Sequence, residues 1–459
     1  MMLSFVEVLA ATGGRTLDAE QPPERLRVVT DTRVLRPGDL FVALRGVRFD
    51  GHDFIPDAIR GGAVAVVVEE SHARHWGVPA VVVGDTRRAY LALAAAARMH
   101  FGGRVAAVTG SAGKTTVKHL LGAILAAQYG DRIAITPANE NNEIGVSKLL
   151  LSLDDRHDVA VIEMGARHPG EIAELAAAAR PHVGILTNVG EAHLEFFGTR
   201  ERLADTKWAL PAAAQRAVLN AEDDVCRARA ATLGAPPLWF GTDPALADDP
   251  IVRGDLTVVT PEGRLLRISE GRTEERPLAH ALPGAHNRAN LAAAITAAMA
   301  LGVTTEQIAA LAPSLKLPDG RYERIACAGG ATVIYDAYNA SFSGTCAALD
   351  AFASEPARRR IAVLAGMAEL GDRAPDFHEE VGRRAARSGL DLLLVGGEYA
   401  DRLERGARSG GMDEHRIVRF DSNESAARYL RAHASAGDVV LLKGSRRYRM
   451  EEILERLRA

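Results

Sequence analysis

The sequence is poor in cysteine: Cys226, Cys327 and Cys346 are the only three in 459 residues. They lie far apart and none belongs to a C-x-x-C pair, so the spacing of a structural zinc site is missing and a disulfide framework is not indicated. We therefore predict three buried thiols in a reducing compartment.

The chain also lacks an excess of charge of one sign and a long apolar run. Its formal net charge is −4, with no dense basic stripe, which argues against general nucleic-acid binding because phosphates must be neutralised by Lys and Arg. No apolar run reaches the roughly 18 residues of a membrane helix. The first residues carry Glu7 and no basic segment typical of a secretion signal. We expect a cytoplasmic protein without a membrane span or a nucleic-acid partner.

What is present is a series of short apolar runs in three segments, as expected for a chain too long for one core. Residues 1–84 hold short strand-like runs divided by turn residues, and "GDTRRAYLALAAAARMHFG" reads as a connecting helix. Residues 85–312 alternate apolar strands with helical patterns, which predicts a mostly parallel sheet covered on both faces. Residues 313–459 repeat this alternation in a smaller, Rossmann-like domain. We predict an α/β protein of three domains with these limits.

The stretch "VTGSAGKTT" carries the clearest chemistry of the central segment. A strand that feeds a glycine turn at a helix N-terminus presents backbone N–H groups to an anion. Gly110 and Gly113 supply the turn, although Val108 stands where the general phosphate-loop pattern has glycine. Lys114 would reach the β- and γ-phosphates of ATP, and the Thr115 hydroxyl would bind Mg²⁺.

Two further strand ends, at "VAVIEMG" and "VGILTNVGEAHLEFFG", carry Glu163 and His193. In open α/β sheets, ligands bind outside the carboxyl ends of the strands, so both side chains could converge on the phosphates. Glu163 suits Mg²⁺, a cation that prefers oxygen ligands, and His193 could bind a second ion. Taken alone, a solvated glutamate and a structural histidine explain these residues as well. Lys207, in "LADTKWAL", is by itself indistinguishable from a surface lysine.

Several long motifs in order resemble the ATP-dependent Mur ligases of peptidoglycan synthesis: "VTGSAGKTT", "VIEMGARHPGEIAEL", "ILTNVGEAHLEFFGT" and "LPGAHNRANLAAA". The N-terminal "TDTRVLRPGDLFVALRGVRFDGHDFI" is similar to the family's uridine-nucleotide domain, and the resemblance covers the whole chain. "YDAYNA", "LAGMAELGDRAPDFHEEVG" and "GDVVLLKGSRRYRMEEIL" resemble the branch that adds D-alanyl-D-alanine. The D-N-P-R signature of the diaminopimelate-adding branch is not in the sequence.

The resemblance implies a role for each matching residue. The expected ATP-binding residues are Thr109, Gly110, Ser111, Ala112, Gly113, Lys114, Thr115, Thr116, His286, Asn287, Asn290, Arg321 and Asp336. The expected ligands of two Mg²⁺ ions are Thr115, Glu163, His193 and a carbamylated Lys207. The residues expected to contact the UDP-linked peptide are Asp31, Thr32, Arg33, His52, Asn141, Asn142 and Glu143. Tyr338, Asn339 and Ser445 would contact the amine substrate, and Lys443 would join Lys114, Lys207 and His193 in the catalytic group.

The implied reaction joins D-alanyl-D-alanine to a UDP-N-acetylmuramoyl tripeptide through an acyl phosphate, in a monomer that takes only small-molecule substrates. Some positions depart from the family pattern. Thr32 stands for serine, and Ser147, Lys148 and Leu149 replace P-L-T. Ser341, Gly344 and Thr345 replace Asn, Ser and Met.

Because the segment 341–345 lies near the expected amine seat, a related ligase that forms a different amide bond is an alternative. An ATPase that only hydrolyses ATP is a third reading, which leaves the C-terminal motifs unexplained.

Overall fold

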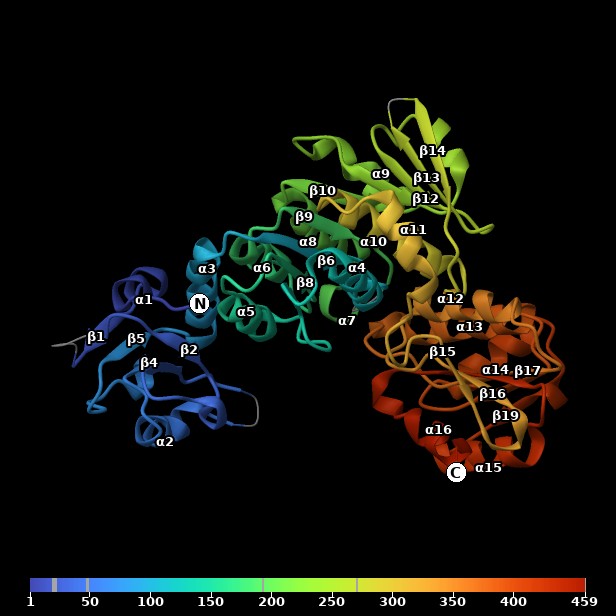
Figure 1. The fold of residues 1–459 in the computed structure, drawn as a ribbon. Helices are drawn as coiled ribbons and strands as arrows, with labels where there is room; N and C mark the ends of the chain where they lie inside the picture. The colour runs from blue at the N-terminus through green and yellow to red at the C-terminus, as the bar shows by residue number, and fades with distance from the viewer. Residues whose placement is uncertain (19–22, 47–48, 192–193, 270, 459) are drawn as a thin grey trace.

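The computed structural model describes residues 1–18, 23–46, 49–191, 194–269 and 271–458, and forms three sheets with helices on their faces (Figure 1). The strands of these sheets lie within residues 15–83, 104–277 and 323–443. The proposed domain limits, 1–84, 85–312 and 313–459, fall between the sheets. In the part of the chain that is described, no helix combines the length and apolar character needed to cross a membrane.

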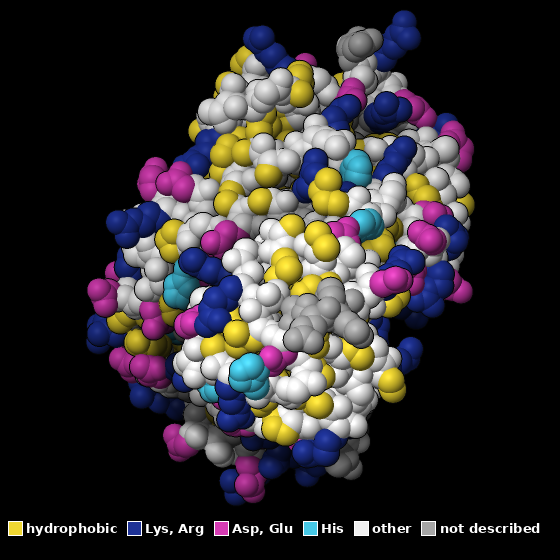
Figure 2. All heavy atoms as spheres, turned by 90° about the vertical axis from the view of Figure 1, so that its left-hand side faces the viewer, with side chains coloured by type: hydrophobic (Ala, Val, Ile, Leu, Met, Phe, Trp, Pro, Cys, Tyr) yellow, Lys and Arg dark blue, Asp and Glu magenta, His cyan; other side chains and the backbone are white. Residues whose placement is uncertain are grey.

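The first sheet has the strand order β1-β5-β4-β3-β2, parallel except for β1. Its strands are β1 (Arg15–Leu17), β2 (Arg27–Val29), β3 (Asp39–Val42), β4 (Ala65–Glu69) and β5 (Ala80–Val83). The helix α2 (Ile55–Arg60) covers one face, and α1 (Phe5–Thr12) and α3 (Thr86–His100) cover the other. The apolar core under α3 continues into the central domain. The predicted connecting helix therefore packs against both domains. On the face shown in Figure 2, basic and acidic side chains are interspersed.

The central sheet has the order β14-β13-β12-β11-β10-β9-β6-β8-β7. Its strands are β6 (Arg104–Thr109), β7 (Ile133–Ile135), β8 (Val159–Glu163), β9 (Val183–Leu186), β10 (Arg216–Asn220), β11 (Leu238–Gly241), β12 (Leu256–Val259), β13 (Arg264–Ser269) and β14 (Arg272–Pro277). Strands β6 to β12 pair in parallel, as predicted, whereas β13 and β14 add an antiparallel ribbon that the sequence analysis did not foresee.

Helices cover both faces of this sheet, as a buried parallel sheet requires. On one face lie α4 (Lys114–Tyr129), α10 (Ala285–Ala300) and α11 (Thr305–Leu311). On the other lie α5 (Glu143–Ser152), α6 (Glu171–Ala179) and α8 (Arg200–Ala213). The shorter α7 (Leu194–Phe197) and α9 (Asp224–Arg229) lie in the connections.

The third sheet has the order β15-β16-β20-β17-β18-β19, parallel except for β15. Its strands are β15 (Glu323–Ala326), β16 (Thr332–Tyr335), β17 (Arg360–Leu364), β18 (Leu392–Val395), β19 (Ile417–Arg419) and β20 (Val439–Lys443). Helices α12 (Phe342–Ala353), α13 (Ala374–Arg387) and α14 (Ala400–Ser409) cover one face, and α15 (Asn423–His433) and α16 (Glu451–Arg458) the other. This doubly wound arrangement agrees with the predicted Rossmann-like class.

Helices α13 and α14 pack closely because a glycine on each helix faces the backbone of the other helix. A Cβ atom on Gly406 would lie 1.9 Å from the carbonyl oxygen of Glu379, and one on Gly382 would lie 2.1 Å from that of Leu403. Alanine stabilises an unobstructed helix by about 1 kcal/mol relative to glycine. At Gly406 and Gly382 the close backbone contact makes alanine destabilising relative to glycine.

We expect Gly406→Ala to lower the free energy of unfolding by about 1–3 kcal/mol, because overpacking forces the two helices apart. Urea denaturation followed by circular dichroism would show a lower midpoint. Gly84→Ala is the control, since a Cβ at Gly84 meets no atom within 4 Å. An equal midpoint for both variants would contradict the proposed close contact.

Candidate functional site

The glycine turn after β6 is packed tightly against neighbouring side chains. Gly110 has φ 150° and Gly113 has φ 84°. A Cβ on Gly110 would lie 1.8 Å from Thr187 Oγ1, and one on Gly113 would lie 2.3 Å from Asn290 Oδ1. Both positions therefore require glycine.

Two residues after β9, which the sequence analysis did not single out, hold this loop in shape. Asn188 accepts from the Ala112 N–H at 3.0 Å and donates to the Ala112 carbonyl at 3.1 Å, while its own carbonyl accepts from the Ser111 N–H at 2.9 Å. Thr187 Oγ1 donates to the same Ala112 carbonyl at 2.6 Å. The signal for these residues was their place at the end of a buried strand, next to the glycine loop.

Helix α4 begins at Lys114 with its N-terminus facing the loop, and no side chain among the described residues caps it. Helix N-terminal N–H groups without a cap favour anions. Lys114 Nζ folds back and donates to the Gly110 carbonyl at 2.8 Å. Burial lowers the pKa of Lys114, the Arg321 charge lowers it further, and Glu163 opposes both effects.

Glu163 ends β8 directly beside the loop, since the strand register pairs it with Val108 of β6. Its side chain is 1% exposed. Its Oε1 atom accepts from Thr115 Oγ1 at 3.2 Å and from Asn141 Nδ2 at 2.8 Å. Its Oε2 atom lies 3.0 Å from Lys118 Nζ. The structure thus joins three predicted residues to Lys118, which had no predicted role.

Lys207 lies in the middle of α8 and is 1% exposed. Burial, together with the positive charge of Lys114, lowers its pKa well below the usual value for lysine. A surface lysine would show neither property. The structure therefore shows that Lys207 is not a solvated surface lysine, which the sequence alone could not decide. The prediction for His193 lies outside the described residues.

The other residues expected near the nucleotide lie around the start of α10. Asn290 Nδ2 donates to Asn287 Oδ1 at 3.3 Å, and Asn287 Nδ2 donates to the Pro283 carbonyl at 2.9 Å. The carbonyl oxygen of the Asn290 side chain faces Gly113. Burial lowers the pKa of His286, against a smaller opposing effect of Asp336 from the C-terminal domain.

The C-terminal predictions meet at the carboxyl ends of β16 and β20. Lys443 Nζ lies 2.8 Å from Asp336 Oδ2 and donates to the Asn339 carbonyl at 3.1 Å. The Arg321 guanidinium stands over the Tyr338 ring, 4.5 Å from its centroid. The Ser445 hydroxyl is buried and has no hydrogen-bond partner among the described residues.

This group faces the phosphate loop across the domain boundary. The charge of Arg321 contributes to the lowered pKa of Lys114. A Cβ on Gly190, whose N–H donates to Ser111 Oγ at 3.0 Å, would lie 2.9 Å from Ser343 Oγ. The two domains are therefore in contact beside the loop.

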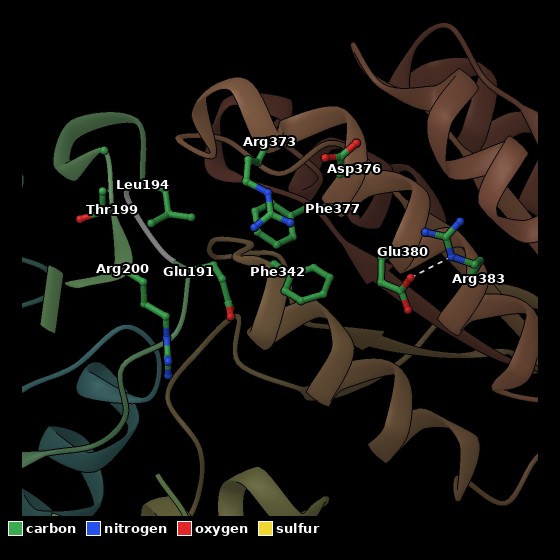
Figure 3. A pocket seen from close by; sticks show the side chains of 11 residues that line it. Glu191, Leu194, Thr199, Arg200, Phe342, Arg373, Asp376, Phe377, Glu380 and Arg383 are labelled. Carbon is green, nitrogen blue, oxygen red and sulfur yellow. Dashed lines mark hydrogen bonds and ion pairs between the residues drawn. The ribbon is translucent and has the colours of Figure 1, made fainter. Parts of the chain in front are cut away.

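A cavity of about 610 Å³ opens between these domains, close to that contact (Figure 3). Phe342, in the segment that departs from the family pattern, lines it and lies 4.7 Å from Phe377, ring centroid to centroid. Glu191 lines the side of the central domain, and Arg373 lies over Phe377 at 4.7 Å. The wall thus combines aromatic rings with charges of both signs.

In the N-terminal domain the expected uridine-nucleotide residues occupy two turns. Asp31 caps the short turn that begins at Thr32 and pairs with Arg33 at 2.6 Å, which lowers the pKa of Asp31 to about 2. His52 is buried: its Nε2 accepts from the Glu69 N–H at 2.9 Å, and its Nδ1 lies 2.5 Å from Asp50 Oδ1. Both ring nitrogens of His52 are therefore engaged within the protein.

The three predicted residues at 141–143 face different partners. Asn141 contacts Glu163, as described above. Asn142 caps α5, accepting from the Gly145 N–H at 3.0 Å, and Glu143 forms an ion pair with Arg87 of α3. Of these three residues, Asn141 is the one whose described hydrogen bond reaches Glu163 beside the phosphate loop.

Comparison with known families gives three matches in chain order. The model of the Mur ligase family catalytic domain matches residues 27–100. The model of the Mur ligase middle domain matches residues 108–298, and that of the Mur ligase glutamate ligase domain matches residues 320–446.

Similar proteins extend over nearly the whole chain. A UDP-N-acetylmuramoyl-tripeptide–D-alanyl-D-alanine ligase of Synechocystis is 36% identical over 438 residues, covering 94% of this chain and 92% of the relative. The enzyme of the same name from Escherichia coli is 35% identical over 443 residues, covering 94% and 93%.

Solved structures are also similar over nearly the whole chain. MurF from Acinetobacter baumannii, 28% identical, superposes with a TM-score of 0.85 over 100% of this chain and 99% of that one. MurF from Thermotoga maritima in complex with ADP, 32% identical, has a TM-score of 0.78 over 94% and 97%. The glycine loop, the buried carboxylate beside it and these full-length matches establish that the chain belongs to the Mur ligase family.

Proposed function

We propose that this chain is an ATP-dependent ligase that joins D-alanyl-D-alanine to a UDP-N-acetylmuramoyl tripeptide in peptidoglycan synthesis, with release of ADP and phosphate. The observation that carries the proposal is the phosphate loop, with Lys114 and Glu163 beside it, facing Arg321 of the C-terminal domain. The full-length relatives bear the name of this activity. ATP and a UDP-linked substrate agree with a cytoplasmic protein, and a monomer remains our expectation.

The loop and the start of α4 are proposed to bind the triphosphate through backbone N–H groups. The loop residues in this role are Thr109, Gly110, Ser111, Ala112, Gly113, Lys114, Thr115 and Thr116. His286, Asn287 and Asn290 would lie near the adenine, and Arg321 and Asp336 would approach the nucleotide from the C-terminal domain. Lys114 would stabilise the charge that develops on the transferring phosphoryl group.

The donor atoms around Glu163 fit Mg²⁺. Its carboxylate and the Thr115 hydroxyl lie 3.2 Å apart, and both offer the oxygen ligands that this hard cation prefers. When bound, Mg²⁺ would neutralise phosphate charge and polarise the γ-phosphoryl group. Thr115 and Glu163 would hold one ion, with His193 and a modified Lys207 as further predicted ligands.

Lys207 has the environment needed to become a carbamate. With its pKa lowered by burial and by Lys114, the amine loses its proton at a pH where exposed lysines stay charged. A neutral amine adds to CO₂ with loss of one proton and becomes a carbamate with one negative charge. This modification would place a second carboxylate-like group in a site where Glu163 is surrounded by lysines.

The reaction proposed for the chain has two steps. The tripeptide carboxylate attacks the γ-phosphorus of ATP, releasing ADP and forming an acyl phosphate. The neutral amine of the dipeptide then attacks the acyl carbonyl, and phosphate leaves. Contact between the central and C-terminal domains would exclude water from this intermediate and hold the reactants together. Lys443 is proposed to act with Lys114 and Lys207 in this group.

The substrates would approach from two sides. We propose that the UDP-linked peptide lies along Asp31, Thr32, Arg33, His52, Asn141, Asn142 and Glu143. We propose that the amine lies near Tyr338, Asn339 and Ser445. The names of the full-length relatives do not favour a different amide product, despite the altered segment 341–345.

The first test is a turnover assay with ATP, Mg²⁺ and UDP-N-acetylmuramoyl tripeptide carrying diaminopimelate or lysine as third residue, with and without D-alanyl-D-alanine. We expect phosphate release to require both substrates, and the product mass to increase by the dipeptide. Phosphate release that is independent of the amine would indicate an ATPase. Turnover with another amine but not with D-alanyl-D-alanine would indicate a different ligase.

The second test concerns Lys207. In ¹³C-labelled bicarbonate near pH 7, we expect a carbamate carbon signal from the native protein that Lys207→Met abolishes, because the lowered pKa makes the neutral, reactive amine more abundant at Lys207 than at exposed lysines. The variant should lose about 100-fold or more in kcat, as when one charge-stabilising group is removed from an active site. Lys148→Met, at an exposed lysine, is the control. A signal that survives Lys207→Met would exclude the modification at this residue.

A further inference from the structure

Lys118 lies one helical turn after Lys114 on α4, and its side chain is only 6% exposed. Burying a lysine ammonium is costly unless it is paired and hydrogen-bonded. Its two partners therefore indicate what the buried charge does.

The Lys118 ammonium bridges two separate elements beside the phosphate loop. Its Nζ atom lies 3.0 Å from Glu163 Oε2, at the end of β8. The same atom donates at 2.5 Å to the carbonyl of Ala138, in the segment that connects β7 to α5. One side chain thus links the carboxylate to this connection.

The connection, residues 136–142, forms two further hydrogen bonds with Glu163. Asn141 Nδ2 donates to Glu163 Oε1 at 2.8 Å, and Thr136 Oγ1 accepts from the Glu163 N–H at 3.0 Å. Ala138 has φ 42°, a left-handed conformation that costs free energy in a residue other than glycine and persists where neighbouring contacts hold it. The Lys118 hydrogen bond is made to this residue's carbonyl.

The two carboxylate oxygens of Glu163 also have different partners. Oε2 forms the ion pair with Lys118 and has no hydrogen-bond partner among the described residues, while Oε1 accepts from the Thr115 hydroxyl of the phosphate loop. A second group that fixes the orientation of a metal-binding carboxylate tunes the affinity of the site. An ion pair that served stability alone would not require a carboxylate shared with the phosphate loop.

We propose that Lys118 is a positioning residue that couples the connection 136–142 to the Glu163 carboxylate, so that the seat of the muramoyl peptide and the metal site form together. The identity of the peptide rests on the function proposed above. The coupling itself rests on the contacts of Lys118.

The experiment compares Lys118→Met with the native chain, using two binding measurements that need no turnover. The first is the affinity for Mn²⁺, as a probe of the magnesium site, in the presence of a non-hydrolysable ATP analogue, followed by electron paramagnetic resonance. The second is calorimetric titration with UDP-N-acetylmuramoyl tripeptide without nucleotide or metal. We expect both affinities to fall by about tenfold or more, the usual effect of removing a group that orients a metal ligand. Affinity for the metal-free ATP analogue should change little.

Two variants serve as controls. Lys118→Arg keeps the charge and should restore part of both affinities. Lys148→Met removes the exposed ion pair between Lys148 and Glu140 of the same connection, which measures 3.0 Å, and should leave the Mn²⁺ affinity unchanged. If Lys118→Met does not fold, Lys118→Gln is measured by the same criterion, since it can still donate to the Ala138 carbonyl.

Loss of both affinities in a folded variant, with rescue by arginine, would support the coupling. Unchanged Mn²⁺ affinity in the folded variant would overturn it, as would an equal loss in Lys148→Met. If the native chain itself fails to bind the UDP-linked tripeptide, the proposed substrate is wrong, and the Mn²⁺ measurement still decides the role of Lys118 toward Glu163.

Discussion

A cluster of buried lysines at the carboxyl ends of the central strands is the constraint on which the rest of the site depends. Lys114, Lys118 and Lys207 gather there, and Glu163 is the carboxylate that the described contacts place among them. Lys114 and Lys207 both have lowered pKa values, with burial as the main cause in each. Such a site is stabilised by an anion of high charge. A triphosphate on the glycine loop would supply that anion.

The same electrostatics bear on the arrangement of the domains. Arg321 belongs to the C-terminal segment, yet its charge lowers the pKa of Lys114 in the phosphate loop. Two like charges held near each other across a domain boundary repel, unless an anion lies between them. Bound nucleotide would therefore favour the contact that Ser343 makes beside Gly190. A ligand can shift an equilibrium between open and closed forms only by such a difference in affinity, and the position of Arg321 provides a physical source for it.

Much of the fold could be predicted because short, continuous apolar runs mark the buried parallel strands, such as β6, β8 and β20. The ribbon strand β14 could not, since "RTEERP" is polar and exposed and carries no strand periodicity. The residues of the site were likewise predictable only where a local sequence pattern marked them. Glu163 was found because it ends a buried strand next to a glycine loop. Lys118 was missed because the sequence pattern of an amphipathic helix predicts a solvated lysine, whereas the buried Lys118 side chain contacts Ala138 and Glu163, which are distant in sequence. Burial created by contacts distant in sequence leaves no local pattern.

The departures in the segment 341–345 differ in their physical weight. Ser341 replaces the usual asparagine but still caps α12, with its Oγ accepting from the Gly344 N–H at 3.2 Å. Serine and asparagine are about equally good helix caps, so the start of α12 and the preceding Tyr338 and Asn339 can keep their positions. Thr345 is buried and lies within the helix. Phe342 is not one of these departures, but its ring lines the cavity between the domains and packs on Phe377. Ser341 thus keeps a cap at the start of α12, and within the segment 341–345 the ring of Phe342 lines the cavity.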